Sequence, residues 1–111
     1  MYKIVTFVPV QDAGRLRQAM GDTGAGDWGK YHHASFSSKG TGRFTPSKGA
    51  RPAIGQIGKQ TEVEEERIEV ICQKEKLKDV VTAIKKTHPY EEVPIEIYQL
   101  VDEEDFYSKG R

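Results

Sequence analysis

Apolar and polar positions follow one another at the start of this chain in a pattern that predicts a strand and then a helix. Residues 2–8 are β-branched and aromatic on both faces, which indicates a strand deep in a sheet that Pro9 ends. Apolar residues then recur at helical spacing up to about Thr23, with Asp12 as the expected N-cap. Gly24 is placed to stop this helix.

The same succession of strand and helix is predicted in the second half of the chain. Apolar side chains at alternate positions indicate a strand over residues 62–72, and the glutamates among residues 62–66 are expected to mark a solvated strand edge. Residues 75–87 form the clearest helix, because four apolar residues make an i, i+3, i+4, i+7 stripe: Leu77, Val80, Val81 and Ile84. Pro89 prevents the helix from continuing, and residues 93–101 predict the last strand.

The middle of the chain, residues 24–59, differs from both ends because it holds eight of the eleven glycines. Two short polar strands are predicted here, over about 31–37 and 42–45, joined by the Ser-Lys-Gly-Thr-Gly turn. Residues 46–58 should then be loop. A long glycine-rich excursion in a compact domain is usually functional, an oligomer contact, or mobile.

The element order β-α-β(β)-β-α-β predicts an α+β fold, the ferredoxin-like two-layer sandwich with a four-stranded antiparallel sheet and two helices on one face. We expect one domain over residues 1–101, with its glycine-rich hairpin or loop at 24–59. The acidic and aromatic tail, 102–111, is expected to fray or to dock on a neighbouring subunit. Apolar side chains on the helix-free sheet face, such as Val5 and Phe7, need a cover, and packing between subunits is its simplest source.

Charge and composition limit the classes of partner and the cellular location that we expect. The 17 basic and 17 acidic residues give zero formal net charge, which argues against nucleic acid as the main partner and permits self-association. No apolar run approaches the length of roughly 18 residues that a membrane span needs. The single cysteine, Cys72, has no intrachain disulfide partner and is expected to be a buried small hydrophobe. With a start that goes directly into strand-like sequence, these features predict a cytoplasmic protein.

Five motifs occur in order along the chain: GDWGKYHHASFS from Gly26, GTGRFTP from Gly40, IGQIGK from Ile54, VEEERIEV from Val63 and HPYEE from His88. Together they resemble the insert domain of the YqfO family, also called NGG-interacting-factor-three-like proteins and often labelled GTP cyclohydrolase type-two homologues. The resemblance implies a PII-like or CutA-like fold and relation to free-standing versions of that insert. CutA, a trimeric protein tied to divalent-cation tolerance, has a similar His-Pro-Tyr-Glu segment, which implies a homodimer or, by this analogy, a trimer.

The resemblance does not extend to catalysis. Full-length members resemble amidohydrolase-like metal proteins, and their two-metal site is built by the domain that flanks the insert. Neither their metal ligands nor a cyclohydrolase activity is therefore transferred to this chain. The sequence itself contains no complete catalytic constellation, so no catalytic residue is assigned.

The segment from His88 to Glu92 is the first candidate site. One interpretation is a divalent-metal or small-ligand site at a subunit edge, with His33, His88 and Glu92 as candidate metal ligands. The other is a structural turn, in which Tyr90 buries its ring and His88 bonds a backbone carbonyl at the helix end. His32 and His33, if they lie on a strand, point to opposite faces and do not easily share a metal.

The glycine-rich middle is the second candidate, because its cations have only Asp27 opposing them. Amide-rich turns with lysine and arginine can hold an anion or a nucleotide, and the candidate ligand-binding residues are Lys30, Lys39, Arg43 and Tyr90. No Walker-type phosphate motif accompanies them, and a solvated loop explains the same composition.

These observations lead to three hypotheses. The first is a non-catalytic, PII/CutA-like homo-oligomer that binds a small ligand or metal ion or serves as an interaction module, with an unknown cofactor and no stoichiometric metal. The second is a divalent-metal-dependent hydrolase acting on a nucleotide, with His33, His88 and Glu92 as ligands. The third is an accessory subunit for a separately encoded metal-bearing domain.

Overall fold

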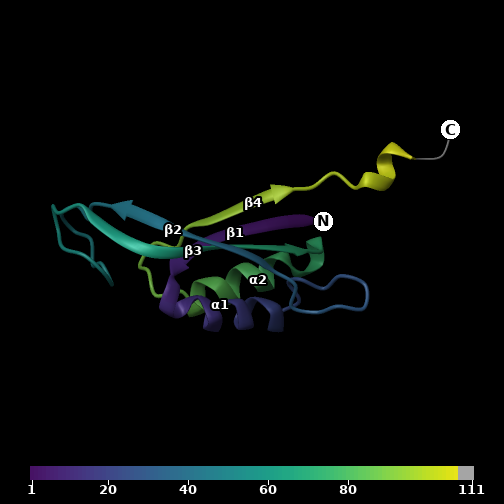
Figure 1. The fold of residues 1–111 in the computed structure, drawn as a ribbon, viewed down its shortest axis with the longest axis horizontal. Coiled ribbons are helices and arrows are strands. Elements are labelled where there is room, and N and C mark those ends of the chain that lie inside the picture. Colours follow the sequence, from purple (N-terminus) through teal and green to yellow (C-terminus); the bar gives the residue numbers. More distant parts are fainter. Residues whose placement is uncertain (108–111) are drawn as a thin grey trace.

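The computed structural model describes residues 1–107 and shows a two-layer α+β sandwich (Figure 1). The elements are β1 (Tyr2–Pro9), α1 (Val10–Asp22), β2 (Phe36–Phe44), β3 (Thr61–Cys72), α2 (Lys74–Thr87), β4 (Ile95–Gln99) and a 3-10 helix, η1 (Glu103–Phe106). The four strands form one sheet in the order β2-β3-β1-β4, and every neighbouring pair is antiparallel. Both α-helices lie on one face of this sheet, which confirms the predicted ferredoxin-like fold.

The core fills the space between the helices and the sheet. Its buried residues come from the two central strands, the two helices and the segment after α1: Ile4, Val8, Ala13, Leu16, Met20, Ala25, Ile68, Val70, Cys72, Val80 and Ile84. Alternate positions of β3 supply Ile68, Val70 and Cys72 to this layer, as their spacing predicts. Burial of each large aliphatic side chain stabilises the fold by roughly 1.5–3 kcal/mol.

Helix α1 starts earlier than its sequence suggests. It begins at Val10 directly after the strand, and Pro9 occupies the N-cap position without a side-chain cap. The prediction of Asp12 as the N-cap is therefore wrong. The carboxylate of Asp12 instead binds the Arg15 guanidinium at 2.8 Å, one turn along the helix. Proline is tolerated at a helix start because its missing N–H would have no partner there.

The two short strands predicted within residues 31–45 are one continuous strand, β2. Its register with β3 runs without a break from the pair Phe36–Glu69 to the pair Phe44–Thr61. The segment predicted as a turn thus lies in the middle of the strand. Gly42 contributes there because a Cβ atom at this position would lie 2.1 Å from Oε1 of Glu65 on β3. The glycine admits a neighbouring side chain and does not mark a turn.

The sheet face without helices is covered by side chains of the same chain. Val5 is completely buried, and the Arg67 guanidinium lies 5.5 Å from the centroid of the Phe7 ring. Glu69 accepts from Lys3 and from Arg67, each at 3.2 Å, and the Lys3 ammonium is the main cause that lowers the Glu69 pKa. The aliphatic stems of these charged residues cover apolar surface, so the cover expected from another subunit is partly supplied within one chain.

The described chain extends beyond the sheet after β4. β4 is shorter than predicted. The chain continues past it into η1, and the side chain of the preceding residue, Asp102, accepts a hydrogen bond from the Glu104 amide at 2.9 Å. Figure 1 shows this segment projecting away from the sandwich. The remainder of the predicted tail, 108–111, lies outside the described residues. Across residues 1–107, neither α-helix has the length and apolar character that crossing a membrane requires.

Candidate functional site

The imidazole of His88 holds the turn that follows α2 against β1, and only 6% of the surface of this residue is exposed. Its Nε2 lies 2.7 Å from the carbonyl oxygen of Phe7, and its Nδ1 accepts from the Tyr90 amide at 3.1 Å. Because Nδ1 accepts, Nε2 carries the proton and donates it to the carbonyl. Burial lowers the His88 pKa and keeps the ring neutral. Both ring nitrogens are engaged in the turn, so neither offers a lone pair to a metal ion.

Tyr90 extends from this turn toward the end of the sheet. Its hydroxyl donates to Oε2 of Glu65 on β3 at 2.7 Å. Its ring meets Phe44, the last residue of β2, edge to face, with centroids 6.0 Å apart and planes at 61°. Burial, followed by the neighbouring Glu65 carboxylate, raises the Tyr90 pKa well above its ordinary value. Tyr90 is therefore a neutral donor that joins three segments distant in sequence.

The loop between β2 and β3 folds back over the same turn. The Gly58 amide donates to the Pro46 carbonyl at 2.7 Å and closes the loop, and the Arg51 amide donates to Oε1 of Glu91 at 2.9 Å. Gly55 has φ +98°, and a Cβ atom there would lie 2.6 Å from the Thr61 hydroxyl. A residue with a side chain would be strained at this position, so the glycine allows the loop its path.

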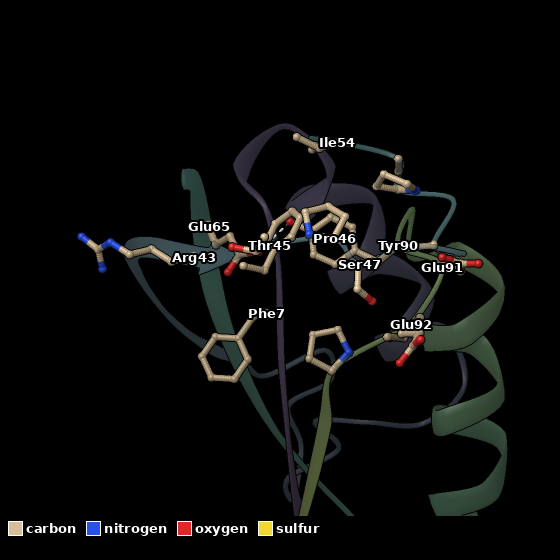
Figure 2. A pocket seen from close by; sticks show the side chains of 17 residues that line it. Phe7, Arg43, Thr45, Pro46, Ser47, Ile54, Glu65, Tyr90, Glu91 and Glu92 are labelled. Carbon is tan, nitrogen blue, oxygen red and sulfur yellow. Dashed lines mark hydrogen bonds between the residues drawn. The ribbon is translucent and has the colours of Figure 1, made fainter. Parts of the chain in front are cut away.

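These segments line a solvent-open cavity of about 630 Å³, which we call the sheet-end cavity (Figure 2). Its apolar lining includes three aromatic rings, three prolines and an isoleucine: Phe7, Phe44, Tyr90, Pro46, Pro52, Pro94 and Ile54. Its charged lining consists of three carboxylates, Glu65, Glu91 and Glu92, and one cation, Arg43. The Arg43 guanidinium binds Glu62 at 2.9 Å, and Figure 2 shows it pointing away from the other labelled side chains. The lining that faces the cavity is therefore apolar and acidic.

The structure separates the four residues predicted to bind a ligand. Arg43 and Tyr90 both line the sheet-end cavity. Lys39 lies on β2 and lines a smaller hollow of about 210 Å³ with Thr41 and Arg67. Lys30 lies in the exposed segment between α1 and β2. The cations of the glycine-rich middle therefore do not converge on one anion site.

The three candidate metal ligands are also apart. His33 packs beside the end of α1, where its Nε2 lies 3.0 Å from Oδ1 of Asp22. His88 bonds the strand that precedes the same helix, so about 15–20 Å of helix separates the two imidazoles. Glu92 lines the sheet-end cavity. Within residues 1–107, no group of three His, Cys, Asp or Glu side chains is arranged to hold a metal ion.

His32 and His33 are not on a strand, contrary to the expectation that made them face opposite sides. Trp28 and Tyr31 exchange two backbone hydrogen bonds, so the chain turns between them. His33 has φ 60°, which is not a strand conformation. His32 Nδ1 lies 3.1 Å from Oδ1 of Asp27. Each histidine therefore has its own carboxylate partner.

Phe44 and Glu65, which contact Tyr90, are two of the cavity residues that the sequence did not indicate. Glu65 belongs to the glutamates expected at a solvated strand edge, but β3 is an inner strand paired on both sides. Phe44 ends a strand whose other residues are mostly polar. An isolated aromatic residue at the end of a polar strand was the available signal for it.

No family model matches this chain. A protein of Halalkalibacterium halodurans named GTP cyclohydrolase 1 type 2 homolog is 42% identical over 111 residues, which cover 100% of this chain and 30% of that protein. The crystal structure of a Bacillus cereus protein related to NIF3 is 44% identical, with a TM-score of 0.79, over 91% of this chain and 26% of the other.

A third similarity concerns the fold alone. The periplasmic divalent cation tolerance protein CutA from Archaeoglobus fulgidus is 17% identical, with a TM-score of 0.67, over 96% of this chain and 91% of that protein. This chain matches 30% of the Halalkalibacterium halodurans protein and 26% of the Bacillus cereus structure, so it spans less than a third of either relative. The chain is thus a homologue of one domain-sized segment of the NIF3-related proteins, the YqfO family of GTP cyclohydrolase 1 type 2 homologues.

Proposed function

We propose that this chain is a non-catalytic, self-associating binding module, and that the sheet-end cavity is its site for a small molecule. The observation that supports the site is the cavity itself. Its volume of about 630 Å³ falls within the range of roughly 300–1,000 Å³ typical of small-molecule pockets. Hydrogen bonds from Tyr90 to Glu65 and from Arg51 to Glu91 connect the segments that form its walls.

Self-association is supported by apolar side chains that one chain leaves uncovered. The exposed large side chains include Phe36 at the start of β2, Tyr98 on β4, and Val101 and Phe106 beyond the sheet. The outer edges of β2 and β4 carry backbone groups that no strand within residues 1–107 pairs. We propose a homodimer or homotrimer, in which the tail after residue 101 is a candidate contact, and a cytoplasmic location without nucleic acid or membrane as partner.

A thermal-shift screen of the full chain tests the binding site. The panel contains nucleotides, amines, carboxylates and divalent cations, and a true ligand at 100 times its dissociation constant adds about 2.7 kcal/mol to stability. The variant Tyr90→Phe removes the hydroxyl that binds Glu65 and should reduce the shift. Tyr98→Phe removes the same atom from β4, where it binds Glu96 at 2.7 Å, and should leave the shift unchanged. A panel without any Tyr90-dependent shift would contradict the proposal.

The names of the relatives support a second candidate, a divalent-metal-dependent hydrolase acting on a nucleotide, either in this chain or in a metal-bearing domain that it accompanies. Metal analysis of the purified chain separates it from the first. One tightly held equivalent of zinc, iron or manganese, lost in His88→Ala and in His33→Ala, would support the metal site. A pull-down that recovers a metal-bearing partner would support the accessory role.

A further inference from the structure

Aromatic rings and carboxylates line the sheet-end cavity. The one cationic residue of the lining, Arg43, binds Glu62 and points away from the other side chains. We propose that the ligand of this cavity is an organic cation, an ammonium or guanidinium group attached to an apolar body. This inference rests on the proposed function, because it names the chemical class that the proposed site would take. It differs from the anion or nucleotide that the lysines and arginines of the middle segment suggest.

The half-buried carboxylate of Glu65 is the first part of the argument. Its Oε2 accepts from the Tyr90 hydroxyl at 2.7 Å, which is a neutral donor. Throughout residues 1–107, no lysine, arginine or histidine nitrogen lies within 4.0 Å of this carboxylate. Two other glutamates of β3 do have such partners, since Glu66 binds Arg17 and Glu69 binds Lys3. Glu65 therefore lines the cavity without an ion-pair partner among residues 1–107, although Lys39 and Arg67 share the smaller neighbouring hollow with it.

The second part is the aromatic wall beside that carboxylate. The rings of Phe44 and Tyr90 both line the cavity and meet edge to face, and the Tyr90 ring also packs on the His88 imidazole, with centroids 4.8 Å apart. The face of an aromatic ring attracts a cation through the ring quadrupole, by roughly 0.5–2 kcal/mol for each contact. Prolines 46, 52 and 94 supply apolar surface next to the rings. A cation with an apolar body can thus contact rings, prolines and carboxylate together.

The third part is the balance of charge around the opening. Glu91 and Glu92 add two carboxylates at the rim, whereas the Arg43 guanidinium is engaged by Glu62 and points away. A phosphate or carboxylate ligand placed in the cavity would lie near three like charges. Charges of one sign close to a protein surface repel more strongly than in bulk water. The negative field of the three carboxylates attracts a cation, so the charge of the lining favours a cationic ligand over an anionic one.

NMR titration of the full, isotope-labelled chain tests this inference, with choline and agmatine as probes. The controls are the uncharged carbon analogue of choline, in which carbon replaces the nitrogen, and inorganic phosphate. We expect a cationic probe to shift the amide signals of Phe44, Tyr90 and Glu91 and to bind at least about tenfold more tightly than the uncharged analogue. Phosphate should not shift these signals.

Two charge-neutralising variants make the test specific. Glu65→Gln keeps an oxygen that accepts from Tyr90 but removes the charge, so it should weaken cation binding by about five- to tenfold. Glu64→Gln removes the same charge from the exposed neighbouring position on the other face of β3 and should change binding less than about twofold.

The outcomes separate the inference from the function on which it rests. Equal binding of choline and its uncharged analogue, or phosphate binding at these amides, would overturn the cation inference and leave a binding cavity in place. Equal effects of the two glutamate variants would show attraction by the whole surface and would also overturn it. Both would be overturned if no probe shifted the amide signals of Phe44 and Tyr90 and no compound of the thermal-shift panel gave a Tyr90-dependent shift.

Discussion

The Nε2 atom of His88 donates a hydrogen bond to the carbonyl oxygen of Phe7 over 2.7 Å, and this bond connects the end of α2 to the end of β1 across 81 positions of the chain. The other ring nitrogen accepts from the Tyr90 amide and sets the direction in which Tyr90 leaves the turn. The histidine therefore positions one wall of the sheet-end cavity. The structural role of His88 is thus to fix the turn between α2 and β4.

Replacing His88 by alanine should destabilise the fold by about 2–3 kcal/mol, because it leaves the Phe7 carbonyl without its donor and opens a buried space. Urea unfolding followed by circular dichroism measures the change. His32→Ala is the matched control, since the His32 side chain is 70% exposed and its loss should cost less than about 0.5 kcal/mol. Equal stability of the two variants would contradict a structural role for His88.

Stability should fall with acidification from neutral pH. Burial lowers the pKa of His88 in the folded chain below the ordinary 6.5, so the unfolded chain binds a proton first as the pH falls. The stabilisation from the neutral imidazole is therefore present above pH 6.5 and is lost as the pH falls toward the lowered folded pKa. The unfolding free energy, measured by urea titration between about pH 7.5 and 5, should slope downward in this range. The slope should be smaller in His88→Gln, and an unchanged slope would contradict the assignment.

Gly26 should be far less replaceable than Gly29, although both have positive φ, at +83° and +57°. A Cβ atom at Gly26 would lie 2.2 Å from the Ala34 carbonyl oxygen, whereas nothing lies within 4 Å of one at Gly29. Gly26→Ala should cost about 3 kcal/mol or more because backbone must move, and Gly29→Ala about 1 kcal/mol for the left-handed conformation alone. Chemical denaturation of both variants measures the difference, and similar costs would show that the segment after α1 adapts freely.

The pair between Arg17 and Glu66 should contribute more than the pair between Arg43 and Glu62. The Glu66 side chain is 8% exposed, so Arg17→Ala leaves a carboxylate buried without its partner and should cost about 2–3 kcal/mol. Both members of the other pair are more than half exposed, and Arg43→Ala should cost less than about 1 kcal/mol. Thermal unfolding at low and high salt compares the variants. A larger effect at Arg43 would mean that Glu66 is solvated in solution.

Local periodicity was sufficient for the elements that form the core. The stripe of α2 and the alternation of β3 depend on residues a few positions apart, and both elements lie where these patterns place them. β2 was predicted as two strands because its glycines resemble a turn when no partner is considered. The pairing of Gly42 with β3 and the closeness of the Glu65 side chain explain the glycine, and both depend on a strand more than twenty positions away.

The candidate site was less accessible to sequence reasoning than the fold. The turn from His88 to Glu92 was visible as a dense group of polar residues, and Tyr90 was named as a candidate. Its partners Glu65 and Phe44 come from two other strands, so no motif contains all three residues. The charge of the middle segment predicted an anion site, but the folded chain directs Arg43 to Glu62 and leaves carboxylates at the cavity. Charge along a sequence does not give the charge of a cavity, because the cavity selects residues from separate segments.

A crystal structure of the full chain soaked with a mixture of small organic molecules tests the central claim most directly. We predict electron density for a bound molecule in the sheet-end cavity, in contact with the Phe44 and Tyr90 rings and with the Glu65 carboxylate. Molecules bound only at other surfaces, or a loop between β2 and β3 that fills the space between Phe44 and Tyr90, would contradict the claim that this cavity is a binding site.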